Sequence, residues 1–441
     1  MALTNGESKL RVAVIGSEMG GMVLGLCLKK FAPDVHFDIH ESAAELTEVG
    51  AGTQRIWWVM KELELQEELS TITGSPLLSP RSLTFPSQGS ISLSYRKGDE
   101  EEVIDLFQFI QVQTFQRAVL QQLLAKRLDA ADRIHFSKRL SSYSEPETDG
   151  SITLNFKDGT TATCDVLIGS DGIRSAVRRT MFNEYADEAA QRGEGEEAAR
   201  LRDMVEPVFS GQVAYRGLAP ASALSEEALE HVRTPQIRCV RAHGILPGSC
   251  SERTGFVARL TCMLLIQLLM NVGGYGLLVP CLAVKYTPGH DRVYGGPWVE
   301  PTTGEAVAKM FEGWQPNPGR CQGAGAGQAF EDGYIPSLIL AHPSVTLVNL
   351  SEALKLYDEV RRPFSQGILK GSDRNGATYQ MRREGSGWEN FTAGDSGAGR
   401  YPREWLAAIA EDVQAQMQWQ LHTNIEDDRA RVVERLATLA T

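Results

Sequence analysis

The segment from residue 11 to residue 41 restricts the fold of this chain more than any other. An apolar run, Val12–Ile15, has the character of a strand buried on both faces, and a glycine cluster follows it. A helical pattern of apolar residues comes next, and then a second strand over 35–39 leads to Glu41, 20 positions after Gly21. Strand, glycine turn, helix, strand and acid in this order predict a dinucleotide-binding βαβ unit.

The glycine turn predicts how such a ligand would bind. Gly16, Gly20 and Gly21 let backbone N–H groups approach a pyrophosphate at the helix N-terminus. Glu41 is expected to accept hydrogen bonds from a ribose. The usual pattern G-x-G-x-x-G has a glycine where this chain has Glu18, and a carboxylate there is expected to crowd and repel the phosphates.

Length, charge and cysteine usage narrow the class of protein. A chain of 441 residues allows two or three domains with large cores, and a net charge of −12 disfavours nucleic acid as a partner. The seven cysteines form no C-x-x-C pair, and the N-terminus has no cationic and apolar signal segment. These features predict a reduced, cytoplasmic location.

No metal site is expected. His36 and His40 have H-x-x-x-H spacing, but on a strand this spacing separates them by about 13 Å, too far to share one ion.

The segment 260–284 contains no charged residue and is long enough to span a bilayer. A buried pair of elements joined by a glycine turn is the favoured interpretation, because the segment also holds Gln267, Asn271, Gly273, Gly274 and Pro280. Membrane attachment through this segment is the alternative.

Most other elements follow from periodicity and turn signals. Gly52 lies in a glycine turn at 49–54 that could present its backbone to a ligand. Residues 184–202 predict a solvated helix or a surface insertion. Further helices are predicted over 56–69, 115–128, 354–364 (stopped near Pro363) and twice after 402, and strands over 91–95, 103–109, 134–143, 152–156 and 212–217.

Four stretches in this order resemble the class A flavoprotein monooxygenases, most closely the salicylate-hydroxylase-like branch common in fungi. AYRGL at 214–218 and YDEVRRPF at 357–364 are also typical of that branch. The four stretches are 12–41, FQRAVLQQLL at 115–124, DVLIGSDGIRSAVRR at 165–179 and QGAGAGQAFEDG at 322–333.

The resemblance implies an enzyme that binds FAD, uses NAD(P)H as co-substrate and activates O2. A flavin C4a-hydroperoxide would hydroxylate or epoxidise a small aromatic or conjugated molecule. The implied fold is α/β: a Rossmann-like three-layer FAD-binding domain over 9–75, 110–180 and 315–370. A mostly β substrate domain over 76–109 and 181–314 and a helical C-terminal tail over 371–441 complete it.

The resemblance also implies roles for single residues. Arg117 falls on the flavin-contacting arginine, and the Asp-Gly motif supplies Asp171, Gly172 and Arg174 for the pyrophosphate and the approach of NAD(P)H. Tyr215 and Arg216 are the candidates for the substrate face, although a salt bridge is an equal alternative for Arg216. The glycine loop places Gly323, Gly325 and Ala326 near the isoalloxazine.

One family motif is missing from the chain. Members carry a Gly-Asp motif on a strand just before the glycine loop, and its aspartate binds the ribityl chain of the flavin. Here Gly319-Arg320-Cys321 runs straight into Gln322, so the sheet is expected to show a gap or an exposed edge. Two interpretations stay open: an active monooxygenase, or an inactive fold relative with weak or no flavin binding.

Overall fold

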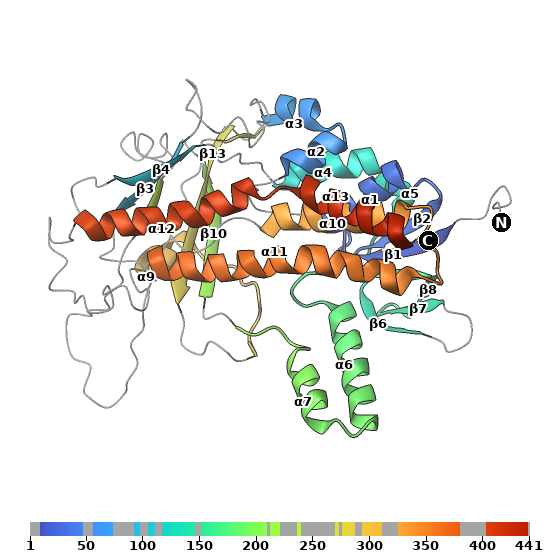
Figure 1. The fold of residues 1–441 in the computed structure, drawn as a ribbon. Coiled ribbons are helices and arrows are strands. Elements are labelled where there is room, and N and C mark those ends of the chain that lie inside the picture. Colours follow the sequence, from blue (N-terminus) through green and yellow to red (C-terminus); the bar gives the residue numbers. More distant parts are fainter. Residues whose placement is uncertain are drawn as a thin grey trace.

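A four-stranded parallel sheet forms the centre of the computed structural model (Figure 1). Its order is β5 (Ile134–His135), β2 (Val35–His40), β1 (Leu10–Ile15) and β9 (Val166–Gly169). Helix α1 (Met19–Phe31) joins β1 to β2, as the βαβ pattern predicts. The structure describes residues 9–46, 56–73, 92–97, 105–110, 117–145, 151–209, 212–220, 236–239, 270–272, 276–286, 293–310, 325–379 and 403–439.

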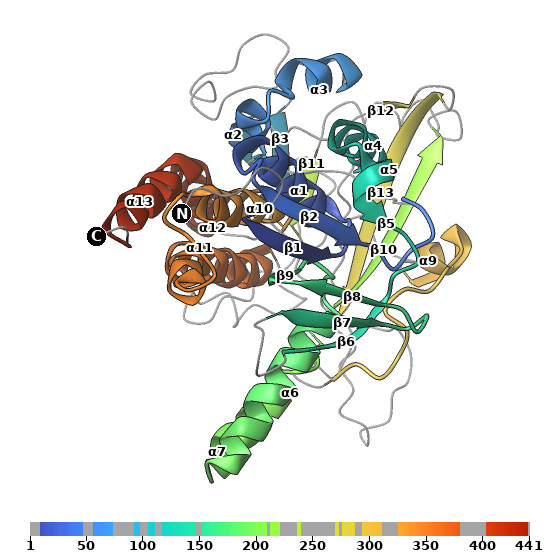
Figure 2. The ribbon, with the colours of Figure 1, turned by 90° about the vertical axis from the view of Figure 1, so that its right-hand side faces the viewer.

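The two faces of the central strand β1 pack against different layers (Figure 2). Val12 and Val14 join a core with α1, α4 (Arg117–Leu128) and α10 (Gly325–Ala341). Ala13 and Ile15 join the opposite core, with an antiparallel sheet of β6 (Leu140–Ser144), β7 (Ile152–Phe156) and β8 (Thr161–Cys164). Successive strand residues face opposite ways, so one apolar run serves both cores. The predicted three-layer α/β fold is confirmed.

Two smaller sheets lie outside these layers. One has the order β11 (Gln236–Cys239), β3 (Ser92–Lys97) and β4 (Asp105–Ile110). The other has the order β10 (Gln212–Pro220), β13 (Gly276–Tyr286) and β12 (Met270–Val272). The described part of the apolar segment thus forms two paired strands, as its glycine turn predicts. Among the helices of the described part of the chain, none is both long and apolar enough to cross a membrane.

Helices α6 (Ala176–Gln191) and α7 (Gly195–Asp203) form a hairpin that projects from the body (Figure 1). Residues 184–202 lie within this hairpin, which confirms the predicted helical surface insertion. Ala186, Ala189, Ala198 and Leu201 give it a small core of its own.

Three sequence predictions about element boundaries are wrong. Residues 56–69 form two helices, α2 (Trp57–Glu62) and α3 (Gln66–Thr73), because Glu64 between them adopts φ 58°. Residues 134–143 divide between β5 and β6, which belong to different sheets. Pro363 does not stop its helix: α11 runs over Leu350–Tyr379.

A buried ion cluster around Arg361 explains why α11 continues past the proline. The Arg361 side chain is 2% exposed, and each of its three partners lies 2.8 Å away. Glu331 and Asp332 belong to α10, and Asp428 belongs to α13 (Ile425–Leu439). Phe364 and Ile368 are also buried just beyond the proline. These contacts offset the roughly 3 kcal/mol that a proline costs within a helix.

The remaining described helices are α5 (Ala130–Arg133), α9 (Gly304–Met310) and α12 (Arg403–His422). Helices α12 and α13 are the two predicted after residue 402, and both pack on α11. The parallel sheet ends at β9 among the described residues, and the segment 311–324, where the Gly-Asp strand is expected to be missing, lies outside them. The proposed division into domains stays a prediction.

The turn between β1 and α1 has no room for side chains at two of its three glycines. Gly16 has φ 102°, and a Cβ there would overlap the carbonyl oxygen of Ser170. A Cβ on Gly21 would overlap the carbonyl oxygen of Gly16. At Gly20 the nearest atom to a Cβ would be 3.5 Å away, an ordinary contact.

These glycines provide a matched pair of variants. We expect Gly16→Ala to lower the free energy of unfolding by about 2–4 kcal/mol, through left-handed strain and the overlap with Ser170. Gly20→Ala is expected to be neutral or stabilising by up to about 1 kcal/mol, because alanine favours the helix. Urea unfolding measures both, and equal effects would contradict the packing described for this turn.

The ion cluster predicts how the C-terminal helix is held. Asp428→Asn removes a charge that faces Arg361, so we expect about 2–4 kcal/mol of destabilisation. Asp427→Asn is the control: its exposed carboxylate lies in the same first turn of α13, so both variants lose a similar helix-dipole contribution. Thermal unfolding of the full chain measures the difference, and an equal loss in both variants would contradict the role of Arg361.

Candidate functional site

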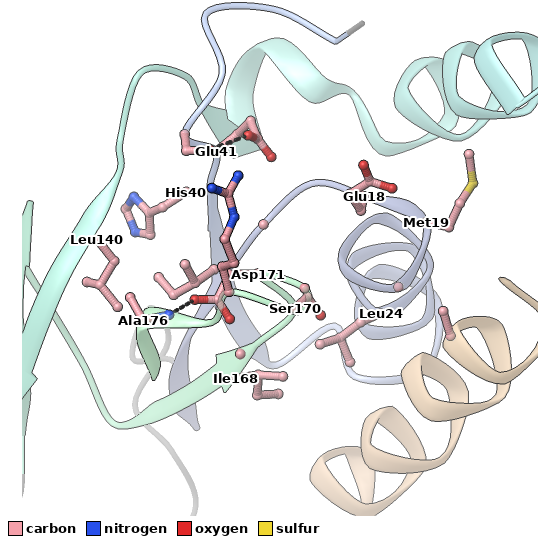
Figure 3. Close-up of a pocket in the computed structure, with 18 of the residues that line it drawn as sticks. Glu18, Met19, Leu24, His40, Glu41, Leu140, Ile168, Ser170, Asp171 and Ala176 are labelled. Atoms are coloured by element: carbon pink, nitrogen blue, oxygen red, sulfur yellow. Dashed lines mark hydrogen bonds between the residues drawn. The ribbon is translucent and has the colours of Figure 1, made fainter. Parts of the chain in front are cut away.

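A cleft of about 880 Å³ lies at the carboxyl ends of β1, β2 and β9 (Figure 3). Its opposite wall comes from the first turns of α1 and α10, including Gly20, Gly325 and Ala326. Figure 3 shows Glu41 and Asp171 on one side and Glu18, at the start of α1, on the other. Open α/β sheets bind ligands at this end of their strands, and the volume is typical of a cofactor site.

The Glu41 carboxylate is fixed at the mouth of the glycine turn. One of its oxygens accepts hydrogen bonds from the backbone N–H and the hydroxyl of Ser17, both at 2.8 Å. The other accepts from the N–H of Ala43 at 2.7 Å and from the hydroxyl of Ser42. Burial alone would raise the pKa of Glu41, but these hydrogen bonds outweigh it and hold the pKa below its usual range. The side chain is therefore an oriented anion suited to bind ribose hydroxyls.

Asp171 joins the cleft to the start of α6. Its Oδ2 accepts from the N–H of Ala176 at 2.6 Å and caps the helix, while the hydroxyl of Ser175 accepts from the N–H of Arg178. Oδ1 is buried and has no hydrogen-bond partner. An unpaired buried carboxylate oxygen is costly, so this atom suits a ligand that carries hydroxyl groups.

His40 is a buried neutral base beside Glu41. The pKa of His40 is lowered to about 4, mainly by burial and to a smaller extent by the nearby His135. Its ring packs between those of His135 and Phe156, at centroid distances of 5.2 and 4.9 Å. The side chain thus contributes an uncharged wall to the cleft at neutral pH.

The carboxylate of Glu18 is unfavourable for phosphate binding in this cleft. It is the N-cap residue of α1, its side chain is exposed, and it lines the cleft. The positive end of a helix stabilises a carboxylate at this position, and the same end is where a diphosphate would bind. Glu18 therefore competes with an anionic ligand for the helix N-terminus.

The far end of the cleft reaches the Arg361 ion cluster. Asp332 and Tyr357 line the cleft there, and burial raises the pKa of Asp332, although Arg361 opposes this shift. Gly333 permits this arrangement, because a Cβ there would lie 2.9 Å from the backbone nitrogen of Leu24. Helices α1 and α10 consequently approach each other closely behind the cleft.

The structure brings most of the predicted cofactor residues together. Arg117 is the first residue of α4, and Gly52 and Gly323 lie outside the described residues. Those that line the cleft are Gly16, Gly20, Glu41, Asp171, Gly172, Arg174, Gly325 and Ala326, while Gly21 packs against Gly16 directly behind it.

The predicted substrate residues lie elsewhere, on β10. Tyr215 is half-buried. The pKa of its hydroxyl is raised mainly by this burial and to a smaller extent by the nearby Tyr294. Arg216 is its neighbour on the same strand. Their substrate role stays a prediction. Within the described ranges, no three His, Cys, Asp or Glu side chains are grouped as metal ligands would be.

Sequence reasoning missed several contributors to the cleft. Ser17, which orients Glu41, has no signal beyond its place after Gly16. Gly333 does carry one, since an isolated glycine within a helix often marks a close approach. Arg139 and Lys157 also line the cleft from segments that only the fold brings together.

No protein-family model matches the chain. FAD-dependent monooxygenase str9 of Strobilurus tenacellus is 29% identical over 97% of this chain and 98% of its own length. That alignment has 481 positions, so the relative holds residues that have no counterpart among the 441 here.

The chain is also similar to salicylate hydroxylases, both in sequence and in structure. One from Pseudomonas putida is 25% identical over 94% of this chain and 97% of its own length. The solved structure of a salicylate hydroxylase substrate complex covers 97% of this chain and 98% of that chain, with a TM-score of 0.66 and 22% identity. The resemblance predicted from the sequence is thus confirmed: the chain is a homologue of the class A FAD-dependent monooxygenases of the salicylate-hydroxylase type.

Proposed function

We propose that this chain is an FAD-dependent monooxygenase that uses NAD(P)H and O2 to hydroxylate or epoxidise a small aromatic or conjugated molecule. The observation that carries the proposal is the cleft at the strand ends, with an ionised and oriented Glu41 beside the glycine turn. The relatives are FAD-dependent monooxygenases and salicylate hydroxylases, and this indicates the class of reaction.

Apart from Glu18, the residues of the cleft fit a dinucleotide such as FAD. Glu41 would hold the adenosine ribose, and the N–H groups at the start of α1 would hold the diphosphate. The unpaired Oδ1 of Asp171 would accept from a hydroxyl of the cofactor. When bound, FAD supplies the electron transfer and the oxygen chemistry, and the protein orients it and excludes water. The oxygen-transfer route implied by the resemblance stays a prediction.

A second candidate is an inactive relative that holds flavin weakly or not at all. Glu18 at the helix N-terminus favours it, as does the absence of the family's Gly-Asp motif from the sequence. The residues of the str9 monooxygenase that have no counterpart here favour it too.

Two measurements distinguish the active monooxygenase from the inactive relative: reduction of the flavin by NAD(P)H, and transfer of an oxygen atom to a substrate. The purified chain is saturated with FAD, and NAD(P)H oxidation is followed with a panel of hydroxylated benzoates, phenols and conjugated ketones. We expect at least one compound to stimulate oxidation and to gain one oxygen atom from labelled O2, as seen by mass spectrometry. Flavin that stays oxidised with every compound and both nucleotides would contradict the monooxygenase.

Two carboxylates of the cleft, Glu18 and Glu41, are expected to act in opposite directions on FAD affinity. Glu18→Gly removes a repelling charge from the phosphate site, so Kd should fall roughly tenfold. Glu41→Gln removes a charged acceptor, so Kd should rise roughly tenfold to hundredfold. Glu45→Gln, which removes an exposed carboxylate nearby, is the control. Flavin fluorescence titration measures all three, and the same direction of change for Glu18→Gly and Glu41→Gln would contradict these roles.

A further inference from the structure

Three exposed cations border the cleft near Glu41 and Asp171. Arg139 lies between β5 and β6, Lys157 lies in the turn between β7 and β8, and Arg174 lies just before α6. All three line the same cavity although they come from separate segments of the chain.

Backbone and core contacts bring the three segments together. The N–H of Lys157 donates to the carbonyl of Arg139 at 2.9 Å, so these two residues are neighbours across the β6–β7 ladder. Leu140, which follows Arg139, packs in one core cluster with Ala176, two residues after Arg174. Figure 3 shows Leu140 and Ala176 on the same side of the cleft. The cations therefore border one stretch of its rim, which we call the cationic rim.

The positive charge of the cationic rim is not neutralised by the residues that the structure describes. Neighbouring cations have carboxylate partners: Lys138 pairs with Asp158 at 2.7 Å, and Arg179 pairs with Glu206 at 2.9 Å. Arg139, Lys157 and Arg174 make no ion pair with any described residue. In a chain of net charge −12, three unpaired cations on a ligand cleft point to an anionic ligand.

The chemistry of the rim identifies the anion. The diphosphate of FAD belongs at the start of α1, so it leaves these side chains without a partner. NADPH differs from NADH only by a phosphomonoester on its adenosine ribose, and arginine and lysine bind such a group strongly. We infer that Arg139 and Lys157 bind the 2′-phosphate of NADPH, beside Arg174, for which the resemblance already implies a role in the approach of NAD(P)H. This inference rests on the proposed function and makes NADPH the preferred reductant.

Binding and kinetics test the inference with one pair of variants. Arg139→Gln/Lys157→Gln removes two cations of the rim. Lys309→Gln/Lys370→Gln removes two exposed cations from α9 and α11 and is the control. Calorimetry compares 2′,5′-ADP with 5′-AMP on the FAD-saturated protein, because the two nucleotides differ by the 2′-phosphate alone. The KM values for NADPH and NADH are measured in parallel.

The wild type should bind 2′,5′-ADP at least about tenfold more tightly than 5′-AMP, and the rim variant should lose this preference. The KM for NADPH should rise roughly tenfold to hundredfold in the rim variant, while the KM for NADH and both values in the control stay unchanged. Equal binding of the two nucleotides by the wild type, or equal effects of the two double variants, would overturn the inference.

Failure of the proposed function has a different signature. If neither nucleotide reduces the flavin, the monooxygenase proposal is wrong, whereas the calorimetric comparison still decides whether the rim binds a 2′-phosphate. If the protein retains no FAD, the same titration on the protein alone decides it.

Discussion

The contact between Gly16 and Ser170 is the constraint on which the cleft depends. Gly16 follows β1 and Ser170 follows β9, so this contact joins the two turns that lie at the strand ends. A Cβ at Gly16 would separate them. The same turn places Ser17 against Glu41 and directs α1 toward α10. One position without a side chain therefore sets the spacing of the dinucleotide cleft.

A second support comes from the C-terminal part of the chain. Arg361 connects α10, α11 and α13 through the buried carboxylates of Glu331 and Asp428 and the partly exposed carboxylate of Asp332. Burial alone would lower the pKa of Arg361, but Glu331 and Asp332 raise it above its usual range, so the guanidinium stays charged. Because Asp332 also lines the cleft, the helical tail is part of the structure that supports the site.

The sequence predicts the central βαβ unit and its glycine turn, because an apolar run, tightly placed glycines and a spaced acid lie within one local segment. It does not predict the partners of Arg361, which lie 29, 30 and 67 residues away along the chain. For the same reason Pro363 predicts a helix end that tertiary contacts overrule. The cationic rim also exists only after folding, since Arg139 and Lys157 become neighbours through the β6–β7 pairing. Local patterns thus predict the elements and the glycine-turn side of the cleft, while long-range ion pairs and strand pairing form the rest.

Retention of flavin tests the central claim most directly. The purified chain is mixed with FAD and passed through a gel-filtration column, and its visible absorption spectrum is recorded. A cleft built by Gly16, Ser17 and Glu41 predicts that the flavin bands elute with the protein despite Glu18. A colourless protein peak, with all FAD in the small-molecule fractions, would contradict the account and favour the inactive relative.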